Sequence, residues 1–234
     1  MIVDTGSTMT YIPCATCGDG CGPNHVDPAF DYTASSTASL IGCAAAGDGR
    51  CLCGSPRCGC TAAGRCSYTR SYAEQSSSSG ILLQDVLALH DGAAGTPVTF
   101  GCETGESGEI FNQAADGLFG LGSSDASLVN QLAGADVIDD VFSLCFGSVA
   151  GEGALSLGDA PVPPGVTLAY TPLTHHPAHP FYYNVRLLGV SVGGDRLDVA
   201  EVRAGWSASV VGGGLGGVGR RRRQRAKYFL HTSI

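Results

Sequence analysis

The sequence is poor in charge and in long apolar runs, and each shortage excludes a class of protein. Charged residues make up 15% of the 234 residues. No apolar run approaches the ~20 residues that a membrane-spanning helix needs, so we expect no membrane partner. No Asn-x-Ser/Thr glycosylation signal occurs. With 44% hydrophobic residues and 35 glycines, the composition predicts a globular, turn-rich chain dominated by β-structure.

Positive charge is scarce outside one short segment. Six of the 13 basic residues lie between Arg220 and Lys227, and no acidic residue follows Glu201. Residues 1–219 therefore hold seven basic against 21 acidic residues, a net charge of −14. Such an acidic body argues against a nucleic-acid partner and suits a protein that meets low pH, where carboxyl groups are neutral. The run Arg220–Arg225 leaves a nuclear-localisation or RNA-binding patch as an alternative.

Cysteine, in contrast, is abundant, with 11 residues concentrated in the first half of the chain. The C-x-x-C and C-x-C pairs between residues 14 and 66 have zinc-ligand spacings. Zinc modules, however, show two clean pairs about 12 to 20 residues apart, whereas the spacing here is irregular. We therefore predict a disulfide framework, with no metal and no cofactor, formed in an oxidising compartment. The odd count leaves at least one thiol unpaired.

The beginning of the chain conflicts with that compartment. Three residues precede Asp4, which leaves no room for a signal peptide. Our interpretation is that the chain lacks its beginning. The full-length parent is then expected in the secretory pathway, in a vacuole or outside the cell.

The stretch at residues 2–8 carries a carboxylate in a tight polar turn. The β-branched residues before Asp4 favour an extended strand, and Gly6 lets another backbone approach closely. Thr5 and Ser7 supply hydroxyl groups that can bond and orient the carboxylate. The pattern predicts a rigidly held carboxylate, with a solvated Asx turn as the alternative for this motif taken alone.

Two segments predict a β-hairpin with a small, polar tip. Residues 66–72 alternate as a strand does, and residues 81–89 form an apolar returning strand. Residues 73–80, which include four serines in a row, are predicted to form the turn. Such a hairpin can close over a cleft. Tyr72 at its tip is then a candidate ligand contact, or else an ordinary edge-strand tyrosine.

A further apolar run at residues 115–122 is broken by glycines, where another backbone must pass closely. Residues 127–132 have the apolar spacing of a short helix, with Ser127 or Asp125 as its N-cap.

The turn at residues 2–8, the hairpin and the segment Leu118-Phe119-Gly120 resemble, in order and spacing, the pepsin-like aspartic proteases of peptidase family A1. The hairpin tip, Tyr-Ala-Glu near four serines and a glycine, is similar to that of the nucellin-like branch of plants and algae. In that family the tyrosine of the hairpin, called the flap, touches the bound peptide. A hydrophobic-hydrophobic-glycine segment after Asp-Gly packs against the catalytic turn.

The resemblance assigns roles to individual residues. It implies a catalytic carboxylate, a supporting turn and a set of substrate-binding contacts, which are in that order Asp4; Thr5, Gly6 and Ser7; and Tyr72, Tyr11 and Leu118. Pepsins usually carry a tryptophan seven residues after the catalytic aspartate, bonded to the flap tyrosine. Tyr11 takes that position here, and its hydroxyl can still bond.

The resemblance also implies an all-β fold with a nearly complete N-terminal lobe and the first strands of a C-terminal lobe. We expect the N-terminal lobe over residues 1–147, with its first strands missing and a cysteine-rich insertion at about 14–66. Inter-lobe strands and the start of the second lobe follow over 148–200. The Gly/Arg-rich segment 201–234 resembles no protease segment and is expected to be disordered.

A second Asp-Thr/Ser-Gly turn, which the family requires, does not occur after Thr8. We therefore expect an aspartic-type endopeptidase by ancestry, acting on polypeptides, whose chain as printed is inactive because it holds half of the catalytic pair. The alternatives are a non-catalytic, peptide-binding protease lobe and a disulfide-rich secreted module. The oligomeric state cannot be read from the sequence.

Overall fold

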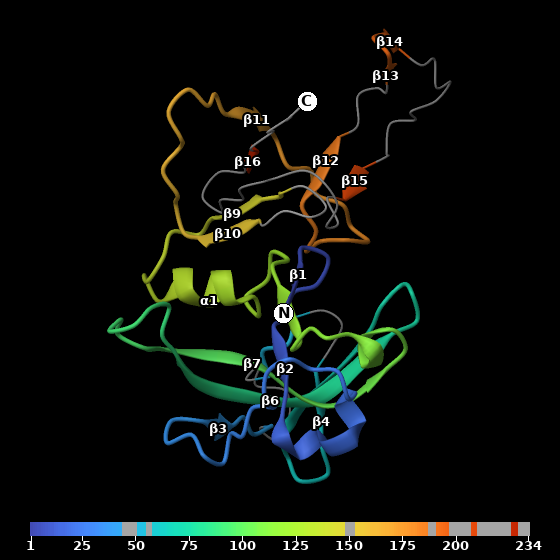
Figure 1. The fold of residues 1–234 in the computed structure, drawn as a ribbon, viewed down its shortest axis with the longest axis vertical. Helices are drawn as coiled ribbons and strands as arrows, with labels where there is room; N and C mark the ends of the chain where they lie inside the picture. Colours follow the sequence, from blue (N-terminus) through green and yellow to red (C-terminus); the bar gives the residue numbers. More distant parts are fainter. Residues whose placement is uncertain are drawn as a thin grey trace. The chain divides into compact units, whose positions relative to one another are not determined.

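The computed structural model describes residues 1–43, 51–54, 58–147, 153–186, 191–196, 207–209 and 226–228 (Figure 1). The chain divides into two compact units, Met1–Val137 and Ile138–Ile234. The all-β prediction is confirmed, because strands dominate both units and the one α-helix among the described residues is short.

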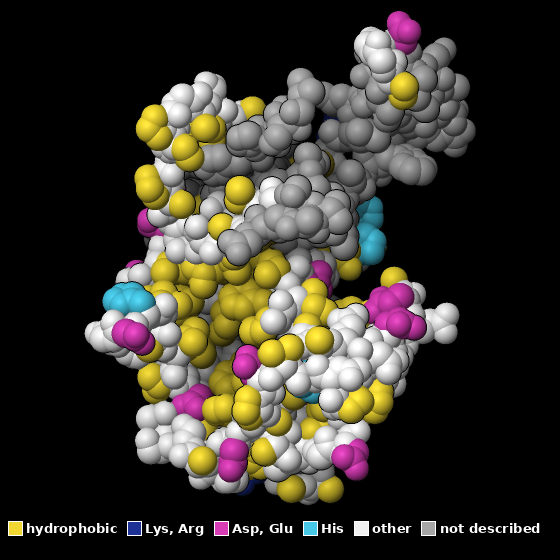
Figure 2. All heavy atoms as spheres, in the orientation of Figure 1, with side chains coloured by type: hydrophobic (Ala, Val, Ile, Leu, Met, Phe, Trp, Pro, Cys, Tyr) yellow, Lys and Arg dark blue, Asp and Glu magenta, His cyan; other side chains and the backbone are white. Residues whose placement is uncertain are grey.

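Unit 1 is built on a mixed sheet of eight strands in the order β1-β8-β2-β7-β6-β5-β4, with β3 paired to β6. Its strands are β1 Ile2–Asp4, β2 Tyr11–Pro13, β3 Ser39–Leu40, β4 Gly59–Cys60, β5 Cys66–Ser71, β6 Ser77–Leu87, β7 Thr96–Ser107 and β8 Leu118–Gly120. On the face drawn in Figure 2, acidic side chains are scattered and almost no Lys or Arg is visible, in keeping with the acidic body.

The core of unit 1 forms where alternating strand residues point to the same side. Along β5 the buried positions are Cys66, Tyr68 and Arg70, two residues apart as the pleat requires. A single apolar cluster collects the inward residues of several strands: Met9, Tyr11, Cys53, Cys66, Tyr68, Leu82 and Leu118. Because this cluster lies under both the start of the chain and the hairpin, it holds the two in a fixed relation.

The predicted hairpin is confirmed, but its turn is shorter than expected. Strand β6 begins at Ser77, so most of the serine run lies in the strand, and Tyr72 to Ser76 make the turn. There the Tyr72 N–H donates to the Ser76 carbonyl at 2.9 Å, and Gln75 adopts a left-handed φ of 72°. The serines extend as a strand because β6 pairs with β5 on one side and β7 on the other, which satisfies their backbone groups.

Helix α1, Leu128–Gly134, confirms the predicted short helix. Its N-cap is Ser127, whose hydroxyl accepts a hydrogen bond from the Asn130 N–H at 3.3 Å. Gln131 then ties the helix to β7, because its side chain accepts from the Thr99 N–H at 2.6 Å and donates to the Thr99 carbonyl at 2.8 Å.

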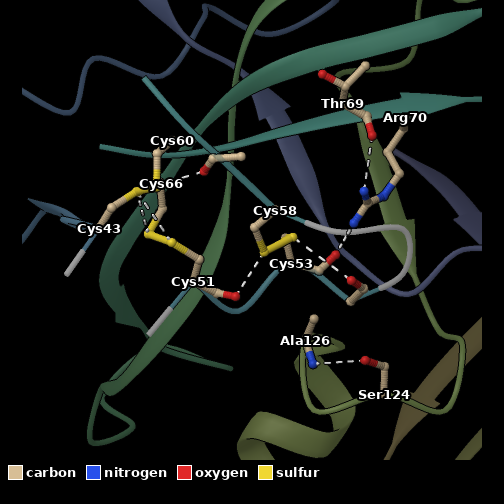
Figure 3. The surroundings of a disulfide bond; sticks show 12 residues. Cys43, Cys51, Cys53, Cys58, Cys60, Cys66, Thr69, Arg70, Ser124 and Ala126 are labelled. Atoms are coloured by element: carbon tan, nitrogen blue, oxygen red, sulfur yellow. Dashed lines mark hydrogen bonds between the residues drawn. A yellow bond between two sulfur atoms is a disulfide. The ribbon is translucent and has the colours of Figure 1, made fainter. Parts of the chain in front are cut away.

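The disulfide framework is present and leaves Cys145 as the free, exposed thiol. The pairs are Cys14–Cys102, Cys17–Cys21, Cys43–Cys60, Cys51–Cys66 and Cys53–Cys58. Figure 3 shows the last three of these bridges close to one another. The sulfurs of Cys43, Cys51 and Cys66 lie within 4.8 Å of one another. Each belongs to a disulfide, however, and metal binding uses the thiolate.

Unit 2 consists of short antiparallel pairs. Strand β9 (Phe142–Cys145) pairs with β10 (Ala154–Leu157). The other pairs are β11 Ala169–Thr171 with β16 Ala226–Tyr228, β12 Asn184–Arg186 with β15 Ser207–Ser209, and β13 Ser191–Val192 with β14 Asp195–Arg196. The arginine run Arg220–Arg225 lies outside the described residues. Among those described, no helix is both long and apolar enough to cross a membrane.

Candidate active site

Asp4 stands at the end of β1, where the strand leaves the sheet. Strand β1 pairs in parallel with β8, so that Asp4 lies opposite Gly120. The Leu121 N–H donates to the Asp4 carbonyl at 2.8 Å. The Asp4 carboxylate, at Oδ1, accepts a hydrogen bond from the Gly6 N–H at 2.7 Å. The sheet therefore positions the backbone of Asp4, and the turn orients its carboxylate.

Glycines let two backbone segments meet at this turn. A Cβ atom at Gly120 would lie 2.5 Å from both the nitrogen and the carbonyl oxygen of Met9. At Gly122 it would lie 2.7 Å from the Ser7 carbonyl oxygen, which accepts the Gly122 N–H at the same distance. Real Cβ contacts are longer than this, so glycine is required at both positions. The predicted packing of the 115–122 run against the turn is thus confirmed.

Of the two hydroxyl groups in the turn, that of Ser7 differs from the expectation. Thr5 is 7% exposed and lies inside the turn. The Ser7 hydroxyl is buried and has no hydrogen-bond partner among the described residues, so it does not bond Asp4 here. The carboxylate is instead oriented by the Gly6 N–H, which lies two residues on, as in an Asx turn.

The two tyrosines predicted to contact substrate are brought together. The Tyr11 and Tyr72 hydroxyls are 2.9 Å apart, although 61 residues separate them in sequence. The Tyr11 ring also stacks on Tyr68, with the ring centroids 5.7 Å apart. The hydroxyl at position 11 thus bonds the hairpin tyrosine, as the sequence suggested that it could.

The charge of Asp4 acts on Tyr72, so Asp4 lies near the tyrosine pair. Burial, followed by the nearby Tyr72, raises the pKa of Tyr11 far above its usual range. Burial also raises the pKa of Tyr72 to about 12, with the Asp4 charge adding to it and the Tyr11 hydrogen bond opposing it. Both phenols therefore stay protonated in any ordinary buffer and serve as neutral hydrogen-bonding groups.

Leu118, the third residue predicted to contact substrate, is buried in the core. Its side chain is 4% exposed and belongs to the core cluster. On β8 it pairs with Ile2 on one side and Tyr11 on the other. Leu118 therefore supports Tyr11 from within the sheet, and the structure leaves little of its surface for a ligand.

Arg70 is a site residue that the sequence reasoning missed. It is 5% exposed, and its guanidinium donates to the Thr69 carbonyl at 3.1 Å and to the Cys53 carbonyl (Figure 3). It thereby connects the hairpin, close to its turn, to the cysteine-rich insertion, beside the tyrosines. The sequence could have indicated its burial, because Arg70 follows Cys66 and Tyr68 at two-residue intervals along one strand, and alternate residues of a strand point to the same side.

The structure thus brings together a carboxylate in a glycine-lined turn and a hairpin that carries a hydrogen-bonded tyrosine. Residues 1–159 match the family model described as "Xylanase inhibitor N-terminal". Aspartic proteinase 39 of Arabidopsis thaliana is 36% identical over 209 residues, covering 84% of this chain and 42% of that protein. Aspartic proteinase 36 of the same plant is 32% identical, with the same coverage. Aspartic protease 5 of Toxoplasma gondii is 34% identical over 168 residues, covering 64% of this chain and 17% of that protein.

The chain belongs to the pepsin-like aspartic protease family. It spans about two fifths of the length of the Arabidopsis relatives that it matches.

Proposed function

We propose that this chain supplies the N-terminal half of an aspartic endopeptidase site, with Asp4 as one of its two carboxyl groups. The observation that carries the proposal is the arrangement of Asp4, which is held between β1 and β8 and bonded to the Gly6 N–H. The names of the relatives support the reaction class. Unfolded or extended polypeptides are the substrates that such a site would take.

Catalysis of this class needs two carboxyl groups that share one proton. Two carboxylates about 3 Å apart cannot both ionise, so one stays protonated. The ionised member draws a proton from a water held between them, and the protonated member polarises the scissile carbonyl. Asp4 supplies one member, and the second must come from a further Asp-Thr/Ser-Gly turn outside this sequence. The chain alone would then hold a water at Asp4 without cleaving peptides.

The hairpin supplies substrate contacts in this proposal. Tyr72 would close over a bound peptide while its hydroxyl stays bonded to Tyr11 at 2.9 Å. The peptide would lie between the hairpin and Asp4, since the Asp4 charge reaches Tyr72. Membership of the nucellin-like branch and passage through the secretory pathway remain predictions. The five disulfides favour the latter.

The test uses the full-length protein that contains this chain. Cleavage of an unfolded protein at about pH 4, where one of two coupled carboxyls holds a proton, should fall by about a thousandfold or more in Asp4→Asn. Asp19→Asn is the matched control, because Asp19 is exposed in the 3-10 segment η1, Ala15–Cys21. Activity that survives Asp4→Asn in a correctly folded protein would rule the proposal out.

A second candidate is a non-catalytic lobe that binds peptide. The single Asp-Thr-Gly turn in the sequence favours it, and so does the inhibitor named in the family description. Here a labelled unfolded polypeptide would bind to the isolated chain, and binding would weaken in Tyr72→Ala but not in Asp4→Asn. Absence of binding by the isolated chain would leave the protease half-site as the better account.

A further inference from the structure

An extra residue in β7 brings two glutamates to the same side of the sheet. Between β6 and β7 the register shifts, so that Gly80 lies opposite Glu103 while Ser79 lies opposite Gly105. Thr104 is therefore an inserted, unpaired residue, which is a β-bulge. Residues three apart normally point to opposite faces of a strand. The bulge reverses this alternation, and Glu103 and Glu106 come together.

Both carboxyl groups are buried. Glu103 is 0% exposed, and the Glu106 side chain is 1% exposed. None of their four oxygens makes a hydrogen bond of normal geometry with a donor in the described part of the chain, although the Ser78 hydroxyl is close enough to favour the charged form of Glu103. Two adjacent carboxylates in such a place are costly unless a proton joins them.

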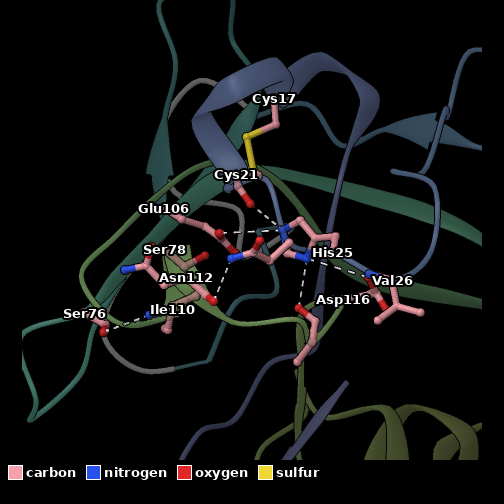
Figure 4. Close-up of polar contacts among 12 residues, drawn as sticks. Cys17, Cys21, His25, Val26, Ser76, Ser78, Glu106, Ile110, Asn112 and Asp116 are labelled. Carbon is pink, nitrogen blue, oxygen red and sulfur yellow. Dashed lines mark hydrogen bonds and ion pairs between the residues drawn. A yellow bond between two sulfur atoms is a disulfide. The ribbon is translucent and has the colours of Figure 1, made fainter.

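His25 lies beside Glu106, as Figure 4 shows. Its Nδ1 lies 3.0 Å from the Ala115 carbonyl oxygen, and its Nε2 contacts the Cys21 carbonyl oxygen. Nε2 is also 3.7 Å from a Glu106 carboxylate oxygen, and Nδ1 is 3.7 Å from a carboxylate oxygen of Asp116.

Asp116, in the segment before β8, also holds the residues that follow His25. Its Oδ1 accepts hydrogen bonds from the Val26 N–H at 2.9 Å and the Asp27 N–H at 3.1 Å. Gly117 follows directly, and a Cβ there would lie 2.1 Å from the Tyr11 carbonyl oxygen. His25 therefore connects the bulged end of β7 to the segment that leads into β8, the strand paired with β1.

We propose that Glu103 and Glu106 form an acid-dependent latch, in which the two carboxyl groups share one proton, while His25 links Glu106 of β7 to Asp116 in the segment before β8. Removing the shared proton would leave two like charges buried side by side. The latch would close in acid and open as the pH rises.

Among the described residues, the ionisable groups on which the Glu103 charge acts are Tyr68, whose hydroxyl bonds Ser78 at 3.1 Å, together with Tyr11 and Tyr72, and none of these is a cation. Among the described residues of the adjoining segments, Asp19 of η1 and Glu109, which precedes η2 (Ile110–Asn112), are exposed. The buried Arg70 guanidinium is bonded to the Thr69 and Cys53 carbonyls.

The direction of the pKa changes agrees with this geometry. Burial, and then the Glu106 carboxyl, raises the pKa of Glu103 well above its usual range. Burial also raises the pKa of Glu106, while its contact with Glu103 and the His25 charge oppose the rise. A carboxyl whose pKa is raised by folding binds its proton more tightly in the native state. Its contribution to stability is complete below the unfolded pKa and is lost as the pH rises toward the folded one.

The test measures urea unfolding of the full chain, with its disulfides intact, at about pH 5 and about pH 7. One proton held only by the native state lowers the folding equilibrium constant tenfold per pH unit across this window. Between about pH 5 and about pH 7, we expect the folding equilibrium constant of the wild type to fall by up to about a hundredfold more than that of Glu103→Gln. The Gln amide can donate to Glu106 without a shared proton. Glu109→Gln is the control, because Glu109 is exposed and lies three residues after Glu106. Its stability should depend on pH as that of the wild type does.

An equal pH dependence in the wild type and in Glu103→Gln would overturn the proposal. A second measurement needs no variant. The infrared band of protonated carboxyl groups should persist in the folded wild type at about pH 7, because ordinary carboxyls are ionised there; a spectrum without that band would also overturn it. Neither readout depends on peptide cleavage, so the latch and the proposed protease half-site fail or hold separately.

Discussion

The disulfide Cys14–Cys102 joins the end of β2 to β7 and closes the longest loop in the chain. Its sequence separation is 88 residues, against 4 for Cys17–Cys21. A bridge restricts the unfolded chain, and its effect grows with the logarithm of the loop length. The other bridges shorten the long loop, but the shortest path still passes through about 70 residues. The corresponding stabilisation is about 4.4 kcal/mol, against about 1.9 kcal/mol for the short loop.

Two double variants compare these bridges directly. Cys14→Ala with Cys102→Ala opens the long loop, and Cys17→Ala with Cys21→Ala opens the short one. Cys14 and Cys102 are both 0% exposed, so their removal also leaves a small cavity that costs about 1 kcal/mol. The free energy of unfolding should therefore fall by about 4 to 6 kcal/mol in the first variant and by about 2 kcal/mol in the second.

Urea unfolding followed by far-UV circular dichroism provides the assay. The long-loop variant should lose a large share of the total of about 5–15 kcal/mol that stabilises domains of this size, which lowers its urea midpoint by about 2–3 M at an m-value of about 2 kcal/mol/M. The short-loop variant should remain folded, with its urea midpoint about 1 M lower at an m-value of about 2 kcal/mol/M. A long-loop variant that loses no more stability than the short-loop variant would refute the reasoning.

Three further changes test the packing around the site by urea unfolding. Gly120→Ala places a Cβ 2.5 Å from the Met9 backbone and should cost at least about 2 kcal/mol; Gly134→Ala, with open space around it, should be neutral or stabilising, and equal effects would contradict the close approach. Ser127→Ala removes the N-cap of α1 and should cost about 1 kcal/mol; an unchanged midpoint would show that the cap contributes nothing. Tyr11→Phe removes the hydrogen bond to the hairpin tyrosine and should cost about 1 kcal/mol, whereas a gain in stability would contradict it.

Features that depend on neighbouring residues could be predicted from the amino-acid sequence. The Asp4 turn, the returning hairpin strands and the capped helix at Ser127 each follow from local conformational preferences and from alternation of side chains. The glycine-broken run at residues 115–122 also signalled a close approach of two backbones, which the pairing of β1 with β8 bears out. The cysteine count predicted a disulfide framework in the same way, since spacing and number are properties of the chain.

Contacts between residues far apart in the sequence, in contrast, could be seen in the tertiary structure only. Pairing of Cys14 with Cys102, and the contact of Tyr11 with Tyr72, depend on strand order in the sheet, which local patterns do not specify. The burial of Leu118, expected to contact substrate, has the same cause. The Glu103–Glu106 pair could not be predicted for another reason. Regular alternation places these two residues on opposite faces of the strand, whereas the bulge at Thr104 brings them to the same face. The bulge arises in the pairing of β7 with β6, which the local sequence does not specify.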